Sequence, residues 1–313
     1  MSTSASAAVA GPLPSRDPLV VGRPEHAGTN ALLNAHLARR GPLVIAHRGT
    51  GIASIVENTR AAARASLASG ADVVEIDLTE SADGAWFAFH DGEEPRLLGI
   101  SENLRLLTAA QIRELEYVHV ARPGRTARVE GLLEVLVSLA PTPGADLAPL
   151  VNLDRSWTAW PRLLPALDEL GMTGQILLKS PAPLREQLDV LRAHPVKHPY
   201  LPICRSPQEV EEITRDRDLN VVGVELLTPT LDHPFADPAY IAALHARGLC
   251  VLLNAERLAN DKRLFGDHDD ELAVLCGPEQ GWGPLLDLGA DLVQTDWPWL
   301  LSAFRDGRRR PGR

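Results

Sequence analysis

The alternation of short apolar runs with amphipathic segments is the feature that most constrains the fold of this chain. Strands that alternate with helices pair in parallel, and eight such units without a glycine-rich nucleotide-binding loop favour a closed barrel over a doubly wound sheet. We therefore expect an α/β protein with the (β/α)8 TIM barrel fold. The expected strands are residues 43–47, 72–78, 148–154, 175–179, 200–204, 221–227, 249–254 and 291–295. The expected helices are residues 58–69, 109–117, 131–140, 160–170, 183–193, 207–216, 238–247 and 283–289.

A ninth apolar run, residues 86–90, predicts a β-hairpin after the second strand. It follows Ser81-Ala82-Asp83-Gly84, a sequence typical of a turn. A tight turn centred between the last two of these residues folds the run back antiparallel on the second strand. That pairing places His90 opposite Asp77.

Length and charge predict one domain and limit its partners. We expect a flexible leader at residues 1–25, a single barrel domain at 26–304 and a basic, solvated tail at 305–313. The net charge of −10 argues against nucleic acid or an anionic membrane as a partner, because both bind cationic surfaces. A small phosphodiester needs only a few local cations and is the partner we expect. The oligomeric state is not predicted.

Cysteine usage and hydropathy bear on location. The three cysteines, Cys204, Cys250 and Cys276, are odd in number, and we expect buried free thiols rather than a disulfide framework or a metal site. Free thiols favour a reducing compartment. No run reaches the roughly 20 apolar residues that span a bilayer, and no basic stretch precedes a hydrophobic one near the first residue. We therefore expect a cytoplasmic protein without stable membrane insertion.

Acidic residues lie inside or at the ends of strands that should be buried. In a TIM barrel the active site lies at the carboxyl ends of the strands. Glu75 and Asp77 are two residues apart, so their side chains share one face of a strand and repel each other unless a cation lies between them. Oxygen ligands favour Mg²⁺ or Ca²⁺, and Asp154 is the best third ligand. The alternative is that one of these acids caps a helix or pairs with an arginine.

Two of the ten histidines, His47 and His90, end apolar runs beside these acids. Histidine titrates near neutrality and serves as a general acid or base. Arg48 can hold a phosphate through a bidentate pair of hydrogen bonds. No role is predicted for the other eight histidines, because an isolated histidine is more often structural than catalytic.

These motifs, in this order, resemble the glycerophosphodiester phosphodiesterase family. The resemblance covers roughly residues 42–303. The matching motifs are His47-Arg48-Gly49, Glu57-Asn58-Thr59, Glu75-Ile76-Asp77, His90-Asp91 and the closing Thr295-Asp296-Trp297-Pro298.

The resemblance implies a metal-dependent barrel that cleaves a glycerophosphodiester to glycerol phosphate and an alcohol. It implies one divalent cation held by Glu75, Asp77 and Asp154, with His47 and His90 as the acid/base pair and a cyclic phosphate as a plausible intermediate. Three alternatives stay open. One is a phospholipase-D-like lyase that releases a cyclic phosphate. Another is a phosphodiesterase specialised for a sugar or secondary-metabolite conjugate, and the third is a barrel that only binds.

The chain departs from the family pattern at the third expected strand. The family usually has an acid-x-Lys sequence there, whereas Asp154 is followed by Arg155 and Ser156. Either Arg155 turns into the site, or Lys179 from the next strand supplies the positively charged side chain. We favour Lys179; the alternative is a solvated lysine. Trp297 lines the alcohol side of the pocket or only packs, and the segment after His90 is short for a substrate-covering insertion.

Overall fold

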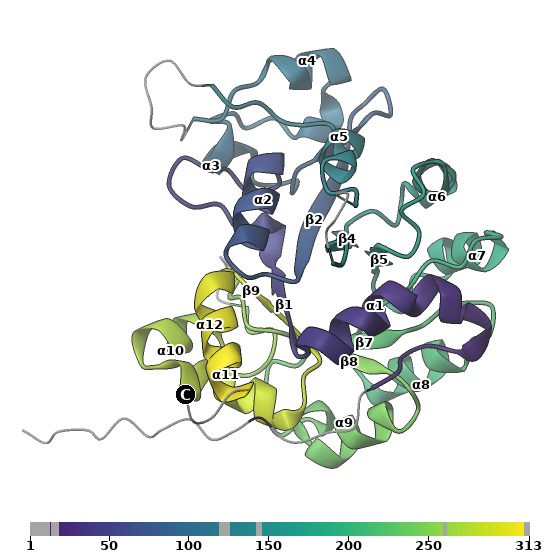
Figure 1. The fold of residues 1–313 in the computed structure, drawn as a ribbon. Helices are drawn as coiled ribbons and strands as arrows, with labels where there is room; N and C mark the ends of the chain where they lie inside the picture. The colour runs from purple at the N-terminus through teal and green to yellow at the C-terminus, as the bar shows by residue number, and fades with distance from the viewer. Residues whose placement is uncertain (1–12, 14–18, 119–125, 142–145, 259–261, 310–313) are drawn as a thin grey trace, which may run out of the picture.

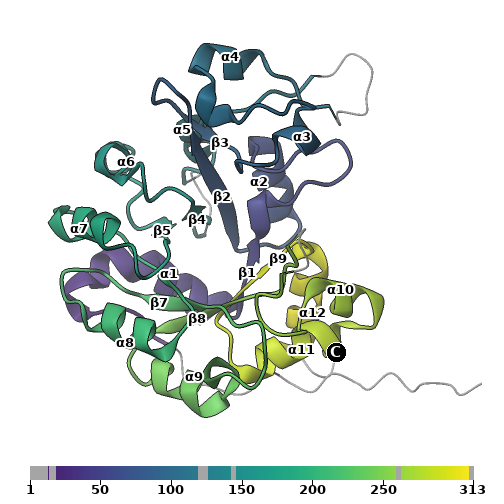
Figure 2. The ribbon, with the colours of Figure 1, turned by 180° about the vertical axis from the view of Figure 1, so that it is seen from behind.

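Parallel strands curl into a barrel with helices around it, as expected (Figures 1 and 2). The computed structural model describes residue 13 and residues 19–118, 126–141, 146–258 and 262–309. The sheet order is β5-β4-β2-β1-β9-β8-β7-β6. Parallel bridges from Leu178 to Tyr200 and from Pro181 to Ile203 join the two ends of this order and close the ring. The strands are β1 (Leu43–Ala46), β2 (Val73–Glu80), β4 (Leu150–Asp154), β5 (Ile176–Leu178), β6 (Ile203–Cys204), β7 (Gly223–Leu226), β8 (Cys250–Asn254) and β9 (Leu292–Thr295).

Helices are found in all eight expected segments, and further helices were not predicted. Thr59, Ser206 and Asp269 each accept a backbone N–H at a helix start, which supplies the cap that the first turn lacks. Helix α1 escaped prediction because polar Asn30 and His36 lie on its buried face and interrupt the apolar periodicity. The α-helices are α1 (Ala27–Arg40), α2 (Arg60–Ala68), α3 (Glu94–Leu97), α4 (Ala109–Glu114), α5 (Leu132–Val137), α6 (Trp160–Glu169), α7 (Arg185–Ala193), α8 (Pro207–Arg215), α9 (Pro238–His245), α10 (Asp270–Leu275), α11 (Pro278–Leu288) and α12 (Pro298–Arg309).

The barrel interior has an apolar layer at the amino ends of the strands. Inward residues there, such as Leu43 and Leu292, pack with Leu33 of α1 in one buried cluster. Because strand side chains alternate between faces, the inward positions that follow are two and four residues further along. On β2 the sequence Val73, Glu75, Asp77 thus runs from the apolar layer into polar positions. The apolar layer supports a polar layer at the carboxyl ends.

The hairpin after β2 is present, but its predicted register is wrong by one residue. Strand β3 (Trp86–Ala88) pairs antiparallel with β2, and Leu78 is opposite Ala88. The Ser81 N–H donates to the Ala85 carbonyl at 2.9 Å, so three residues rather than two lie between the last paired residues, and Gly84 among them adopts φ +83°. Asp77 is consequently opposite Phe89, whose N–H it accepts at 3.2 Å, and not opposite His90.

The segment after His90 contributes to an apolar cluster of its own. Helices α3 and α4 lie beyond one end of β2 in both views, far from α8 and α9 (Figures 1 and 2). Together with Phe87 and Phe89 of the hairpin, this segment buries a separate apolar cluster that includes Leu104, Ile112 and Tyr117.

The ends of the described chain are more ordered than expected. Val21, inside the predicted leader, is buried, and its N–H bonds to the Asn34 side chain at 2.7 Å. The first part of that leader, residues 1–12 and 14–18, lies outside the described residues. The prediction of a solvated tail from residue 305 is wrong for its first part, since α12 runs to Arg309 and buried Arg305 pairs with Asp72. Residues 310–313 lie outside the described part.

The three cysteines are free thiols, and two of them are buried as expected. Cys276 is exposed, which corrects the prediction that all three are buried. It directly follows the short helix α10 and is not on a strand of the barrel. In the part of the chain that the structure describes, we find no helix with the length and apolar character needed to cross a membrane.

Candidate active site

Three carboxylates meet at the carboxyl ends of two neighbouring strands. Glu75 and Asp77 come from β2, and Asp154 ends β4 directly opposite Asp77 in the strand register. One oxygen from each of the three lies within 4.8 Å of the others. The proximity predicted from sequence spacing is therefore what the parallel register produces.

The hydrogen bonds of these acids leave carboxylate oxygens available to bind a cation. The Glu75 Oε2 atom accepts the Arg48 backbone N–H at 2.7 Å, whereas its Oε1 is buried and has no hydrogen-bond partner among the described residues. Burial, and next the charge of Asp77, raise the pKa of Glu75 to about 8. Asn58 orients Asp77, because it donates to Asp77 Oδ2 at 3.0 Å and accepts the Asp77 N–H at 3.0 Å. An oxygen-only donor set with one orphaned buried oxygen fits a hard divalent cation.

His47 lies just beyond β1 and is held by an aspartate from the far end of the chain. Its Nδ1 is 2.8 Å from Oδ1 of Asp296, which follows β9. Burial alone would lower the pKa of His47, but the negative charge of Asp296 and the hydrogen bond to it outweigh burial and raise the pKa to about 10. His47 is accordingly an imidazolium at neutral pH.

Asp296 is itself positioned by a buried carboxylate that sequence reasoning missed. Asp270 of α10 accepts the Asp296 N–H at 2.8 Å and the Thr295 hydroxyl at 2.7 Å. The Trp282 indole also donates to Asp270, at 2.7 Å. Asp270 starts a short helix and belongs to no apolar run, so nothing in the local pattern connects it with the site.

His90 has the opposite electrostatic environment. Its Nδ1 is 2.9 Å from the Asp91 carbonyl, which can only accept, so Nδ1 carries the proton and Nε2 presents a lone pair. That Nε2 faces the Arg155 guanidinium at 3.4 Å. Burial lowers the pKa of His90; Asp77 opposes this shift, and Arg48 and Arg155 reinforce it. His90 is therefore neutral where His47 is charged.

The structure turns both Arg155 and Lys179, the two candidates for the positively charged side chain near Asp154, toward the site. The Lys179 Nζ, which is almost completely buried, lies 2.9 Å from Asp154 Oδ2 and 3.4 Å from Glu225 Oε2. Arg155 adopts φ +53°, and this turns its guanidinium toward Asp91 at 2.5 Å and toward His90. Lys179 neutralises a carboxylate, and Arg155 contacts a histidine.

Arg48 and Trp297 lie at the mouth of the site. Arg48 is buried, and its guanidinium pairs with Glu57 at 2.8 Å and Glu93 at 3.0 Å. Trp297 is 37% exposed and lies against Trp299, with ring centroids 5.4 Å apart. These residues share a cavity of about 690 Å³, whose wall also includes His47, Ile52, Arg96, Arg257 and Asp296.

Comparisons with known proteins identify the family. The profile of the Glycerophosphoryl diester phosphodiesterase family matches residues 47–265, and the chain belongs to this family. The resemblance to this family that the motifs predicted is thereby confirmed. Two Mycobacterium tuberculosis proteins, each named "Probable glycerophosphodiester phosphodiesterase 1", are 41% identical over 76 residues, which is 24% of this chain. The matched region spans about a quarter, 27%, of the length of these relatives.

Solved structures share the fold at low sequence identity. A glycerophosphoryl diester phosphodiesterase from Parabacteroides distasonis has a TM-score of 0.63 and 16% identity, covering 87% of this chain and 89% of its own. One from Thermotoga maritima has a TM-score of 0.58 and 20% identity, covering 84% and 98%. A phosphodiesterase from Oleispira antarctica, solved with the product sn-glycerol-3-phosphate, has a TM-score of 0.60 and 20% identity, covering 85% and 97%.

Proposed function

We propose that this protein hydrolyses a glycerophosphodiester to glycerol phosphate and an alcohol. The observation that carries the proposal is a cluster of three acids that acts electrostatically on two histidines, one protonated and one neutral, at the carboxyl ends of the strands in a barrel of this family. The product bound in the Oleispira antarctica relative supports glycerol phosphate as the class of product.

Glu75, Asp77 and Asp154 would hold one divalent cation, either Mg²⁺ or Ca²⁺. When bound, the cation supplies positive charge that polarises a phosphoryl oxygen. The chain's own contribution is to fix these acids. The Arg48 N–H holds Glu75, Asn58 holds Asp77, and Lys179 holds Asp154. Burial of Lys179 keeps its position fixed beside Asp154.

The two histidines divide the proton transfers. The lone pair on His90 Nε2 takes the proton of the glycerol hydroxyl next to the diester, as this hydroxyl replaces Arg155 as the donor to Nε2. The hydroxyl oxygen attacks phosphorus, and the bond from phosphorus to the alcohol oxygen breaks as the His47 imidazolium protonates that oxygen. Water then opens the cyclic ester, with the proton roles reversed. Arg48 and Trp297 line one cavity with His47. Arg48 would stabilise the charge on the phosphoryl group, and Trp297 would contact the alcohol.

The test is turnover of a panel of glycerophosphodiesters with and without EDTA, with products identified by phosphorus NMR. Linear glycerol phosphate that forms only in the absence of EDTA is the expected result. A cyclic phosphate as the final product would favour the lyase alternative. Turnover of sugar or secondary-metabolite diesters alone would favour the specialised enzyme. No turnover, or turnover indifferent to EDTA, would overturn the proposal.

We also propose a reducing, cytoplasmic setting for this protein. The support is the state of its cysteines: all three are free, and the exposed thiol of Cys276 is open to oxidation elsewhere.

A further inference from the structure

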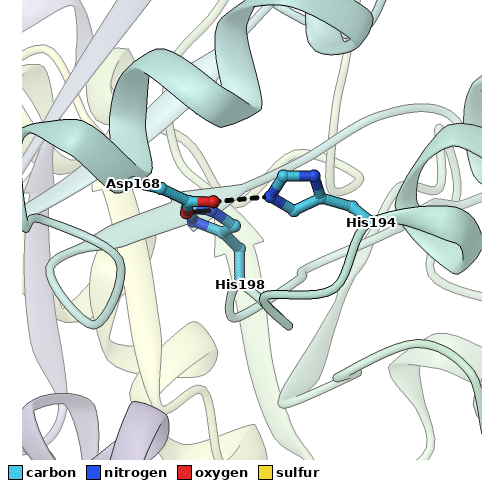
Figure 3. A group of neighbouring side chains, drawn as sticks. All are labelled: Asp168, His194 and His198. Carbon is cyan, nitrogen blue, oxygen red and sulfur yellow. Dashed lines mark hydrogen bonds and ion pairs between the residues drawn. The ribbon is translucent and has the colours of Figure 1, made fainter.

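A second group of metal-ligating side chains lies away from the active site (Figure 3). Asp168 comes from the last turn of α6, His194 directly follows α7, and His198 lies on the segment that leads to β6. These positions precede β5 and β6, so they are at the amino ends of the strands. The acids of the candidate active site are at the carboxyl ends.

Each of the two imidazoles has its Nε2 atom against the carboxylate of Asp168. His194 Nε2 is 2.9 Å from Asp168 Oδ2, and His198 Nε2 is 2.9 Å from Asp168 Oδ1. Figure 3 shows both rings next to the Asp168 carboxylate. One atom from each residue lies within 4.8 Å of the others. Tetrahedral zinc ligands at their usual bond lengths are about 3.3 Å apart. The two histidine–aspartate distances are a few tenths of an ångström shorter than this, so the three side chains already lie close to the spacing of a coordination set.

Burial and charge also favour a cation at this position. The His198 side chain is fully buried and that of His194 is 12% exposed, whereas Asp168 is 24% exposed. The ion and a water ligand thus have access on the Asp168 side. In the described part of the chain, no lysine or arginine is paired with Asp168. A divalent ion bound between these side chains would balance the charge of the partly buried carboxylate.

We propose that Asp168, His194 and His198 form a second metal site, which binds Zn²⁺ or another first-row divalent ion that prefers imidazole. Two nitrogen ligands select such ions over Mg²⁺ and Ca²⁺. The spacing of His194 and His198, with three residues between them, is typical of zinc ligands. The bound ion joins the end of α6 to the segment between α7 and β6 and acts structurally, at the end of the barrel opposite the catalytic acids.

The test is a Co²⁺ titration of the chelator-stripped full-length protein in excess Mg²⁺, which occupies oxygen-only sites. One equivalent of Co²⁺ should bind and give a visible absorption band of tetrahedral or five-coordinate geometry. Proton NMR should show two paramagnetically shifted imidazole N–H signals. His194→Ala should lose one of these signals and weaken Co²⁺ binding at least about tenfold, which is about 1.4 kcal/mol.

His245→Ala is the matched control. His245 also bonds an aspartate through Nε2, at 2.7 Å from Asp291 Oδ2, but this pair belongs to neither cluster of possible metal ligands found among the described residues. This variant should keep both shifted signals. A Cys276→Ser variant excludes binding to the exposed thiol.

Thermal unfolding gives a second readout that does not depend on spectra. Zn²⁺ should raise the melting temperature of the wild type and of His245→Ala, but not of His194→Ala, because only a folded state that binds the ion is stabilised. If the buried His198 cannot be replaced without unfolding, His194→Ala still decides the question, since its side chain is partly exposed. Equal Co²⁺ binding by the wild type and His194→Ala, or no binding by either, would overturn the site.

Discussion

The two ends of the barrel interior are formed by the same strands but differ in what they contribute. At the amino end the inward residues are apolar and pack with Leu33 of α1. At the carboxyl end the next inward residues are acids, amides and Lys179, and buried oxygens of Glu75, Asn152 and other residues there have no partner among the described residues. Excluding apolar surface from water stabilises a fold, whereas unpaired buried carboxylates destabilise it until a cation or substrate binds. Substitutions at the two ends should therefore affect different measurable quantities.

The largest effect on turnover should come from Glu75→Gln. This change removes a cation ligand but keeps the shape of the side chain, so kcat/KM should fall by about 10³-fold or more, because metal charge supplies several kcal/mol to such transition states. The melting temperature of the metal-free protein at pH 7 should not fall, because Glu75 with a pKa of about 8 is mostly protonated there and glutamine is an equally neutral side chain of the same shape. The matched control is Glu80→Gln on the same strand, which pairs with Arg162 outside the site and should keep normal turnover. Near-normal activity of Glu75→Gln would contradict the role of Glu75 as a ligand of the catalytic cation.

The two histidine variants should lose activity and differ in rescue. His47→Ala and His90→Ala should each lose about 10²–10⁴-fold in turnover, the usual contribution of general acid–base catalysis, and both should stay folded. A diester with a nitrophenol leaving group needs no proton on that group. It should therefore restore most of the activity of His47→Ala and little of that of His90→Ala. The reverse pattern would exchange the acid and base assignments, and near-normal activity of either variant would remove that histidine from the mechanism.

At the apolar end, Leu33→Ala should destabilise the fold and leave catalysis intact. Removing this buried side chain opens a cavity and should cost about 2–5 kcal/mol of unfolding free energy, measured by urea denaturation. Turnover per folded molecule should stay within twofold of the wild type, about 0.4 kcal/mol. Leu275→Ala is the control, because this leucine is 79% exposed and its loss should change stability by about 0.5 kcal/mol or less. A large loss of kcat in Leu33→Ala would mean that packing in the apolar layer also controls the geometry of the catalytic residues.

Residues on regular strands could be predicted because position along a strand decides both face and end. Val73, Glu75 and Asp77 alternate with outward residues, so their clustering with Asp154 follows from period-two geometry and parallel register. The same reasoning failed where one extra loop residue shifts the pairing, as Gly84 does in the hairpin. His90 still comes under the influence of Asp77, because the chain leaves the strand after Ala88.

Residues that meet through loops and helix ends could not be predicted in this way. Asp270 reaches Asp296 from a short helix, and Asp168 reaches His194 and His198 across two helix ends. Their separations in the sequence follow no strand or helix period. The direction of Arg155 depends on a positive φ at a residue other than glycine, which no local pattern indicates. Tertiary packing alone sets these contacts.

The remaining expected effect is a pH dependence of stability that originates at the polar layer. The pKa of Glu75 rises from 4.5 to about 8 on folding, so between these values the folded protein holds a proton that the unfolded chain has lost. The contribution of Glu75 to stability is thus present below about pH 4.5 and lost as the pH rises to 8.

Urea denaturation of metal-free protein should show unfolding free energy falling between pH 5 and 8, with a shallower slope in Glu75→Gln than in the wild type. Saturating Mg²⁺ should remove most of that difference, because a bound cation keeps Glu75 ionised. Identical slopes in the two metal-free proteins would show that the acids at the polar end do not destabilise the fold, and that the contrast between the two layers is not one of stability.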